Sequence, residues 1–330
     1  MVDDKNGTEM LTDAEAELYD RQIRLWGLES QKRLRLANVL IIGMNGFGAE
    51  VAKNIILAGV KSVTFLDHRN ITPEDSCSQF LVDRNDLGKN RAKASVARAQ
   101  NLNSMVDVKA DESEVDSKPE AYFQNFHVVC ASECTITQLK KINNICRKFN
   151  IKFFAGDVWG TFGYTFADLN THEYVMDVTQ TKKSDDSSDN KQRMESFVIT
   201  VKNKQVFVPF EKILHAKKLP KDSEVYHLFQ VMLNYREKHG KDPLPSDRDN
   251  NLLLEEAKPI IEEYNLGDSI NHLLEGDLYA QVSPVCAIVG GVMGQEIIKA
   301  VSQKEPPHNN LFLFNPQTFC GKILRLGRLS

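Results

Sequence analysis

The chain has 330 residues, of which 42% are apolar and 26% are charged, a composition typical of globular proteins. Its 41 basic and 45 acidic side chains leave a net charge of −4, so no broad attraction to nucleic acid or to anionic lipid is expected. No apolar run reaches the roughly 18 residues that a membrane-spanning helix needs, and the polar start, residues 1–8, predicts no secretory signal. The six cysteines form no Cys-x-x-Cys pair, which predicts reduced thiols rather than disulfides.

The first half of the chain predicts alternating helices and strands. Thr12 and Glu15 form a capping-box pattern at the start of an N-terminal helix, which Gly27 ends, and a second helix is expected at 29–36. The elements expected next are strand 38–42, helix 49–58, strand 62–66, helix 87–101, strand 106–109, strand 128–131, helix 136–149 and strand 152–155. This order predicts an α/β fold with a doubly wound, Rossmann-like, mostly parallel sheet.

After Gly156 the pattern changes to strands without intervening helices, typical of a β-meander. Residues 182–195 are polar and predict a mobile loop. The remaining elements expected are strands 161–168, 174–178 and 196–201, helices 223–238, 250–264 and 284–301, and strands 311–314 and 321–326. We therefore expect a Rossmann-like half over 1–160 and a remainder over 161–330 that packs with it as one unit.

A glycine-rich turn follows strand 38–42 and contains Gly43, Gly46 and Gly48. The N-terminus of the helix after such a turn presents free N–H groups and a partial positive charge, which suit phosphate. Asp67, at the end of the second strand, follows at close to the spacing of about 20 residues expected of an acid that binds ribose. Asn45 stands where the G-x-G-x-x-G fingerprint has a glycine. The turn is therefore predicted either as a working phosphate site or as a vestigial, structural one.

Residues 19–27 read Tyr-Asp-Arg-Gln-Ile-Arg-Leu-Trp-Gly and precede the strand and the glycine turn. This stretch resembles the activating enzymes of ubiquitin-like modifiers. The resemblance extends over nearly the whole chain, through Lys53-Asn54, Leu66-Asp67, Gln79–Leu81, Gly88, Ser283–Gly291 and Gln295-Glu296. Members of that family are built from two related adenylation halves, and the resemblance implies that this chain is one of them. In that family one half binds ATP and Mg²⁺ and adenylates the C-terminal carboxylate of the modifier, and the other half keeps the fold without the chemistry.

Five substitutions indicate which half this chain resembles. Cys77 and Ser78 stand where the active half has a phosphate-handling Asn and Arg, and Arg91 stands for its Lys. Cys134 and Thr135 align with its Asp-Asn pair, of which the Asp holds Mg²⁺. A thiol and a hydroxyl are poor ligands for this hard cation. The resemblance therefore implies the inactive half, with no metal site and with Gly43, Gly46, Gly48 and Asp67 as vestigial cofactor-binding residues.

The cysteines and the chain length indicate which member of the family the chain resembles. No cysteine has the sequence setting of the family's catalytic cysteine, and Cys286 lies in an apolar helix where a core role is expected. A free-standing inactive half of this length is similar to the non-catalytic subunit of a heterodimeric SUMO-activating enzyme. The resemblance then implies a catalytic subunit as partner, SUMO bound through the complex, and ATP with Mg²⁺ at the partner's site. It also implies a nuclear location, which is inferred from the pathway. The chain itself shows no strong basic cluster that would mark nuclear import.

Arg21 is the candidate catalytic residue. In the family, the matching arginine of the inactive half is thought to reach the ATP phosphates of the partner, and a guanidinium suits that task because it is planar and permanently charged. The alternative is an ordinary surface pair, because Glu17 precedes Arg21 by four residues, as Asp20 precedes Arg24.

Other functions stay open at this stage. The chain could be a self-sufficient homodimeric adenylyltransferase of the bacterial ThiF or MoeB kind, an NAD-dependent oxidoreductase, or a scaffold without phosphate contact. The glycines at 290, 291 and 294 inside the expected helix 284–301 permit close packing, either on the chain's own sheet or against a partner.

Overall fold

The computed structural model describes residues 11–184, 193–217, 219–221 and 223–327. Its centre is an eight-stranded sheet in the order β10-β9-β6-β5-β4-β1-β2-β3, in which the neighbours among β1 to β5 pair in parallel and the remaining pairs are antiparallel. The strands are β1 (Asn38–Ile42), β2 (Ser62–Leu66), β3 (Asp107–Asp111), β4 (Val128–Ala131), β5 (Lys152–Trp159), β6 (Phe162–Asp168), β9 (Leu311–Phe314) and β10 (Gly321–Leu324). This confirms the predicted α/β fold with a doubly wound, mostly parallel sheet. The sheet continues across residue 160, because β5 pairs directly with β6.

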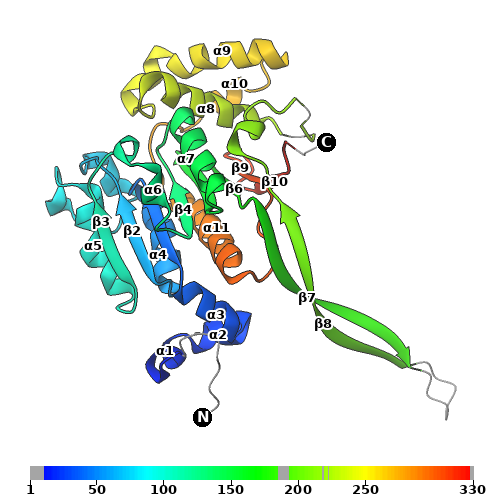
Figure 1. The fold of residues 1–330 in the computed structure, drawn as a ribbon. Coiled ribbons are helices and arrows are strands. Elements are labelled where there is room, and N and C mark those ends of the chain that lie inside the picture. Colours follow the sequence, from blue (N-terminus) through cyan, green and yellow to red (C-terminus); the bar gives the residue numbers. More distant parts are fainter. Residues whose placement is uncertain (1–10, 185–192, 218, 222, 328–330) are drawn as a thin grey trace.

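Helices cover both faces of the sheet, and each face has its own apolar core. One core includes side chains of α4 and α11, such as Phe47 and Met293, and the other includes side chains of α7 and α8, such as Leu139 and Phe229. Figure 1 shows α1–α3 at one end of the molecule and α8–α10 at the other. The helices are α1 (Asp13–Leu18), α2 (Asp20–Trp26), α3 (Leu28–Arg35), α4 (Gly46–Leu57), α5 (Arg91–Leu102), α6 (Glu120–Phe123), α7 (Ile136–Lys148), α8 (Val225–His239), α9 (Leu252–Tyr264), α10 (Asn271–Leu274) and α11 (Ser283–Ser302).

The N-terminal helix differs from the prediction. The Thr12–Glu15 capping box is present, but the helix breaks at Tyr19, so that α1 and α2 replace the single helix expected up to Gly27. Tyr19 is buried, and its hydroxyl accepts a hydrogen bond from Asn103 Nδ2 at 2.8 Å. A tertiary contact of this kind overrides local helix propensity, and the sequence pattern did not reveal it.

The expected meander is divided between two sheets. β6 joins the central sheet, whereas β7 (Thr171–Ser184) and β8 (Arg193–Val206) form a separate two-stranded ribbon that extends away from the fold (Figure 1). The expected loop 182–195 is too long at both ends, because Lys182 pairs with Glu195 and Ser184 with Arg193. Backbone pairing in a ribbon needs no apolar anchor, which is why the polar composition was misleading. Residues 185–192 of that expected loop lie outside the described residues.

The expectation that no apolar run is long enough to span a membrane is wrong for α11. By length and composition this helix of 20 residues could cross a membrane, with a mean hydropathy of 1.4 over its most apolar window. However, 61% of that window is buried inside the protein. Val289, Met293 and Ile297 belong to the core shared with α4, so the hydropathy is that of a core helix.

His172, at the base of the ribbon, gives stability a pH dependence. Its side chain is 4% exposed, and its Nε2 has no hydrogen-bond partner among the described residues. Burial, aided by nearby Lys152, lowers the pKa of His172 from 6.5 to about 4. Because the pKa of His172 is lower in the folded state than in the unfolded state, neutral His172 stabilises the fold above pH 6.5. This stabilisation is lost as the pH falls toward 4. We expect the free energy of unfolding to drop by about 2 kcal/mol more between pH 7.5 and 5 in the wild type than in His172→Phe.

Urea unfolding of both proteins at the two pH values measures this difference. The other histidines whose pKa is lowered, His127, His227 and His308, are present in both proteins and cancel. Equal pH dependence in the two proteins would contradict the prediction.

Candidate functional site

The candidate site is a crevice of about 630 Å³ at the carboxyl ends of the central strands. From β1 the chain runs to β2 and β3 on one side, and it returns to β4 on the other side of β1. In open α/β sheets this reversal of strand order is where ligands bind. The N-terminus of α4 opens onto this crevice, and Asn45 is among its lining residues.

The glycines of the turn are held in place by close contacts within the chain. Gly43 has a φ of +86°, a conformation that favours glycine, and a Cβ there would overlap the Ser132 side chain. A Cβ on Gly46 would overlap the side chain of Ser78, and one on Gly48 would overlap the carbonyl oxygen of Gly43. The fold therefore requires these glycines whether or not a phosphate binds.

This requirement is testable without any ligand. We expect Gly48→Ala to lower the free energy of unfolding of the isolated chain by about 1–3 kcal/mol, because the carbonyl of Gly43 is backbone and can only move with the turn. Gly291→Ala is the control, because a Cβ there has no neighbour within 4 Å. Denaturant unfolding measures both variants. Equal stability of Gly48→Ala and the wild type would show that the turn does not need its glycine for packing.

Two N–H groups in the first turn of α4, where a phosphate would bind, are occupied by the chain's own side chains. Asn45 caps α4, because its Oδ1 accepts a hydrogen bond from Gly48 N–H at 2.8 Å. Gln281 Oε1 accepts from Phe47 N–H at 3.3 Å. Asn45 thus supplies the N-terminus of α4 with the acceptor that a phosphate oxygen would otherwise provide.

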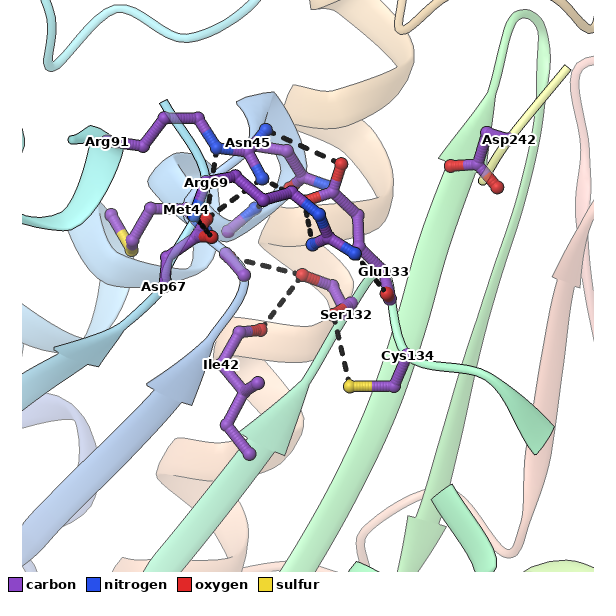
Figure 2. A network of polar contacts seen from close by, with 12 residues as sticks. Ile42, Met44, Asn45, Asp67, Arg69, Arg91, Ser132, Glu133, Cys134 and Asp242 are labelled. Atoms are coloured by element: carbon purple, nitrogen blue, oxygen red, sulfur yellow. Dashed lines mark hydrogen bonds and ion pairs between the residues drawn. The ribbon is translucent and has the colours of Figure 1, made fainter. Parts of the chain in front are cut away.

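Asp67 is also engaged. Its Oδ2 accepts from Met44 N–H at 2.8 Å, and its Oδ1 accepts from Arg69 N–H at 2.9 Å. Arg91 Nε donates to the same Oδ2 at 3.0 Å (Figure 2). The structure therefore brings Asp67 beside the glycine turn, as predicted, but uses its carboxylate to hold the turn and α5 together.

Arg91 is the centre of this polar network. It is 4% exposed and forms ion pairs with Asp67 at 2.9 Å, with Asp75 at 3.1 Å, and with Glu133. Burial alone would lower the pKa of Arg91, but the three carboxylates raise it above its ordinary value. Burial likewise works against the charged form of Glu133, yet Arg91 and Arg69 hold the pKa of Glu133 well below its usual range. Figure 2 shows both arginines converging on Glu133.

A second buried pair lies beside this network. Arg236 Nη1 donates to Asp157 Oδ2 at 2.7 Å and to the carbonyl oxygen of Cys134 at 3.2 Å. Its Nε donates to Asp242 Oδ1 at 2.7 Å, and Asp157 Oδ1 in turn accepts from Glu133 N–H at 2.8 Å. The backbone hydrogen bond from Glu133 to Asp157 therefore links the Arg91 network and the Arg236 pair into one set of polar contacts across the carboxyl ends of the strands.

Cys134, the residue aligned with the metal-binding aspartate, is bonded within the chain. Cys134 is buried, its Sγ donates to the carbonyl oxygen of Ser132 at 3.4 Å, and burial raises the pKa of its thiol to about 12. Thr135 caps α7 by accepting from Gln138 N–H. Within the described residues, no group of three or more His, Cys, Asp or Glu side chains is arranged to hold a metal ion.

The charges that line the crevice balance one another. Equal numbers of cationic and acidic side chains line it: Arg69, Arg91, Arg236 and Lys241 against Glu74, Asp75, Glu133 and Asp242. All three arginines already pair with carboxylates. A triphosphate would meet four carboxylates there, and Lys241 is the one cation of the lining without an ion pair among the described residues. The vestigial role of Gly43, Gly46, Gly48 and Asp67 stays a prediction.

Arg21 is not part of this crevice. Gln22 Nε2, next to it in α2, donates to the carbonyl oxygen of Leu57 at 3.0 Å, so α2 lies at the last residue of α4. The glycine turn lies at the first residue of α4, which at 1.5 Å per residue is roughly 17 Å away. Arg21 is exposed and has no hydrogen bond or ion pair with any described residue, whereas Arg24 pairs with Asp20 at 3.0 Å. The surface ion pair expected between Asp20 and Arg24 is therefore present, whereas the one considered between Glu17 and Arg21 is not found among the described residues.

Two kinds of comparison place the chain in a family. A model described as the ThiF family matches residues 19–328. The chain belongs to the ThiF family. It is similar to SUMO-activating enzyme subunit 1 of Homo sapiens, with 44% identity over 99% of each chain. For the proteins of the same name from Xenopus laevis and Danio rerio, identity is 43% over 96% of this chain and 97% of that one, and 41% over 93% of each. Within the ThiF family the chain therefore belongs with SUMO-activating enzyme subunit 1, which confirms the resemblance seen in the sequence.

A solved structure supports the fold alone. The crystal structure of selenomethionine PaaA superposes with a TM-score of 0.60 at 15% identity and covers 100% of this chain and 79% of that one.

Sequence reasoning missed several site residues. Glu133, Asp157, Arg236 and Gln281 carry the polar contacts of the crevice, and none was singled out. The sequence pattern could have revealed two of these residues, Glu133 and Asp157. Glu133 follows the expected strand 128–131 and Asp157 the expected strand 152–155, so both had to lie at the same edge as Asp67. Arg236 and Gln281 come from later segments, whose approach to this edge depends on the fold.

Proposed function

We propose that the chain is the non-catalytic, regulatory subunit of a heterodimeric SUMO-activating enzyme. Its partner is the catalytic subunit, which adenylates the C-terminus of SUMO with ATP and Mg²⁺ at its own site and then forms the thioester. The observation that carries the proposal is the crevice in which every arginine is already paired, in a chain 41–44% identical to proteins named SUMO-activating enzyme subunit 1.

The part we assign to this chain in the reaction is Arg21. Its guanidinium is exposed and unpaired among the described residues, so it is free to bind phosphate oxygens of another molecule. A planar, permanently charged fork stabilises the negative charge that develops when the carboxylate attacks the α-phosphate. Because Arg21 cannot reach its own glycine turn, it acts on the partner's ATP, and activity then depends on assembly of the heterodimer.

Four of the six thiols of the chain are poorly suited to thioester chemistry. Of the six cysteines, Cys130, Cys134, Cys146 and Cys286 are buried. Burial raises the pKa of the Cys286 thiol to about 12, and it raises the pKa of the other three as well. A thiol with a raised pKa is a poor nucleophile near neutral pH. We assign the reactive cysteine to the catalytic subunit, and a nuclear location to the complex on the basis of the pathway.

Thioester formation tests this assignment. With ATP, Mg²⁺ and SUMO, an equimolar mixture of the two subunits is expected to form a reductant-sensitive SUMO adduct on the catalytic subunit alone. Replacing all six cysteines of this chain by serine or alanine, in steps that preserve folding, is expected to leave the adduct unchanged. An adduct on this chain would show that it carries a catalytic thiol.

A further inference from the structure

The helix that carries Arg21 has little of its own to hold it in place. α2 has 7 residues, and none of its side chains is buried. An isolated helix shorter than about 12 residues is marginal in water, because few hydrogen bonds offset the cost of forming its first turn. The orientation of Arg21 therefore depends on the contacts that α2 and its flanking residues make with the rest of the chain.

Tyr19 is the contact that precedes α2. It stands two residues before Arg21 and is 3% exposed. Its hydroxyl accepts the hydrogen bond from Asn103 Nδ2, and its ring lies against Gly59. A Cβ on Gly59 would come within 2.5 Å of the ring carbon Cζ, so the ring occupies the space that a side chain at 59 would need. Packing and a hydrogen bond thus fix the start of α2.

The C-terminal end of α4 supplies three further points of attachment. The last carbonyl groups of a helix lack partners within it and are available to side-chain donors. Three amide side chains donate to three successive carbonyl oxygens there: Asn103 to Ile56 at 2.9 Å, Gln22 to Leu57 at 3.0 Å and Gln31 to Ala58 at 2.9 Å. Because α4 is a core helix, these oxygens are rigid acceptors.

Gln31 also holds the far end of α2. It is fully buried in α3, and its Oε1 accepts a hydrogen bond from Trp26 Nε1 at 3.1 Å. Trp26 is the last residue of α2. Arg21 therefore lies between two attachments, Tyr19 on one side and the Trp26–Gln31 pair on the other. We call Tyr19, Gln22, Gln31 and Asn103 the α2 clamp.

We propose that the α2 clamp positions Arg21 for the ATP phosphates of the catalytic subunit, with Tyr19 and Gln31 as positioning residues of the adenylation reaction. The proposal rests on the proposed function. Arg21 has no hydrogen bond or ion pair of its own among the described residues, so α2 alone sets where its guanidinium lies. A donor stabilises developing charge only when it is held in place before the reaction, and a misplacement of about 1 Å can cost about 100-fold in rate.

Tyr19→Phe and Gln31→Met test the clamp with little change in volume. The first keeps the ring against Gly59 and removes only the hydroxyl, and the second removes both hydrogen bonds of the amide. We expect each variant to lower SUMO-stimulated ATP–pyrophosphate exchange by about 3–10-fold at saturating subunit concentrations, the size of one or two lost hydrogen bonds.

Tyr226→Phe is the matched control. It also removes a buried tyrosine hydroxyl, which donates to the carbonyl oxygen of Ile213 at 2.6 Å. Tyr226 belongs to α8, at the opposite end of the molecule from α2 (Figure 1). We expect this variant to support exchange at the wild-type rate. Thermal unfolding of each free variant establishes that it is folded.

Combining the clamp variants with Arg21→Ala separates positioning from a general structural role. If the clamp acts through Arg21, Tyr19→Phe lowers exchange in the wild type and causes no further loss in the Arg21→Ala chain. Radiolabelled pyrophosphate at high enzyme concentration follows the slow exchange of these double variants. An equal loss in both backgrounds would overturn the proposal.

The single variants keep the two proposals apart. If Arg21→Ala loses exchange while Tyr19→Phe and Gln31→Met keep the wild-type rate, the clamp is wrong and the proposed function stands. If Arg21→Ala itself exchanges like the wild type, the role assigned to Arg21 in the proposed function fails, and the clamp has nothing to position.

Discussion

Arg21→Ala is expected to lower SUMO-dependent ATP–pyrophosphate exchange by the reconstituted heterodimer by about 10³–10⁵-fold, the range known for arginines supplied in trans to phosphate chemistry. The physical reason is that charge developing on the α-phosphate loses a fixed, permanently charged donor. Folding is expected to be unaffected, because Arg21 is exposed and makes no ion pair or hydrogen bond within the described chain. The effect should therefore appear in the exchange rate at saturating subunit concentrations.

Arg24→Ala is the matched control for Arg21. It lies one turn further along α2 and pairs with Asp20 on the surface, so its loss is expected to cost only about 0.3–0.5 kcal/mol of stability and no activity. Arg21→Lys should recover only part of the exchange, since an ammonium keeps the charge but not the planar fork. Exchange by Arg21→Ala within a few-fold of the wild type would contradict the role assigned to this residue.

Arg91→Met is expected to reduce the free energy of unfolding of the isolated chain by about 3–5 kcal/mol, because it leaves buried carboxylates without their main counter-charge. Glu133 would keep its ion pair with Arg69, whereas Asp67 and Asp75 would lose the ion pairs that they form with Arg91. For a chain of this length a loss of this size lowers the melting temperature by about 4–7 °C. Calorimetry of the isolated chain measures both quantities.

The destabilisation by Arg91→Met is expected to depend on pH, and to decrease as the pH falls. In the wild type the pKa of Glu133 is held below its ordinary value of 4.5, so its stabilising contribution is present above that value and is lost as the pH falls through the lower folded-state pKa. The difference between the wild type and Arg91→Met should therefore be largest near pH 7 and shrink below pH 4.5. Arg98→Met, on the same helix with an exposed partner, Asp83, is the control. Equal stability of Arg91→Met and the wild type would show that the cluster does not hold the site together.

Local patterns predicted most of the fold. The buried runs at 38–42 and 128–131, the glycine turn after the first of them, and Asp67 at the end of the next strand each follow from short-range periodicity and backbone chemistry. The break at Tyr19 and the separate β7–β8 ribbon did not follow, because they depend on contacts between segments far apart in the sequence.

The candidate site was predictable only in part. The glycines and Asp67 were found, and Arg91 was noted as a replacement for a lysine. Its bonding to three carboxylates required β2 and β4 to be placed on either side of β1, with their carboxyl ends at the same edge. Arg236, in α8, and Gln281, just before α11, lie more than a hundred residues later in the chain than Asp67, and no periodicity connects them to it.

The central claim is that this chain performs no adenylation itself but is required for it through Arg21. ATP–pyrophosphate exchange, stimulated by SUMO, tests this for the chain alone, for the catalytic subunit alone and for their mixture. The account predicts exchange in the mixture, none with this chain alone, and a large loss when the mixture contains Arg21→Ala. Exchange by this chain alone would contradict it, because the crevice at Gly43, Gly46, Gly48 and Asp67 would then be a working nucleotide site despite its paired charges.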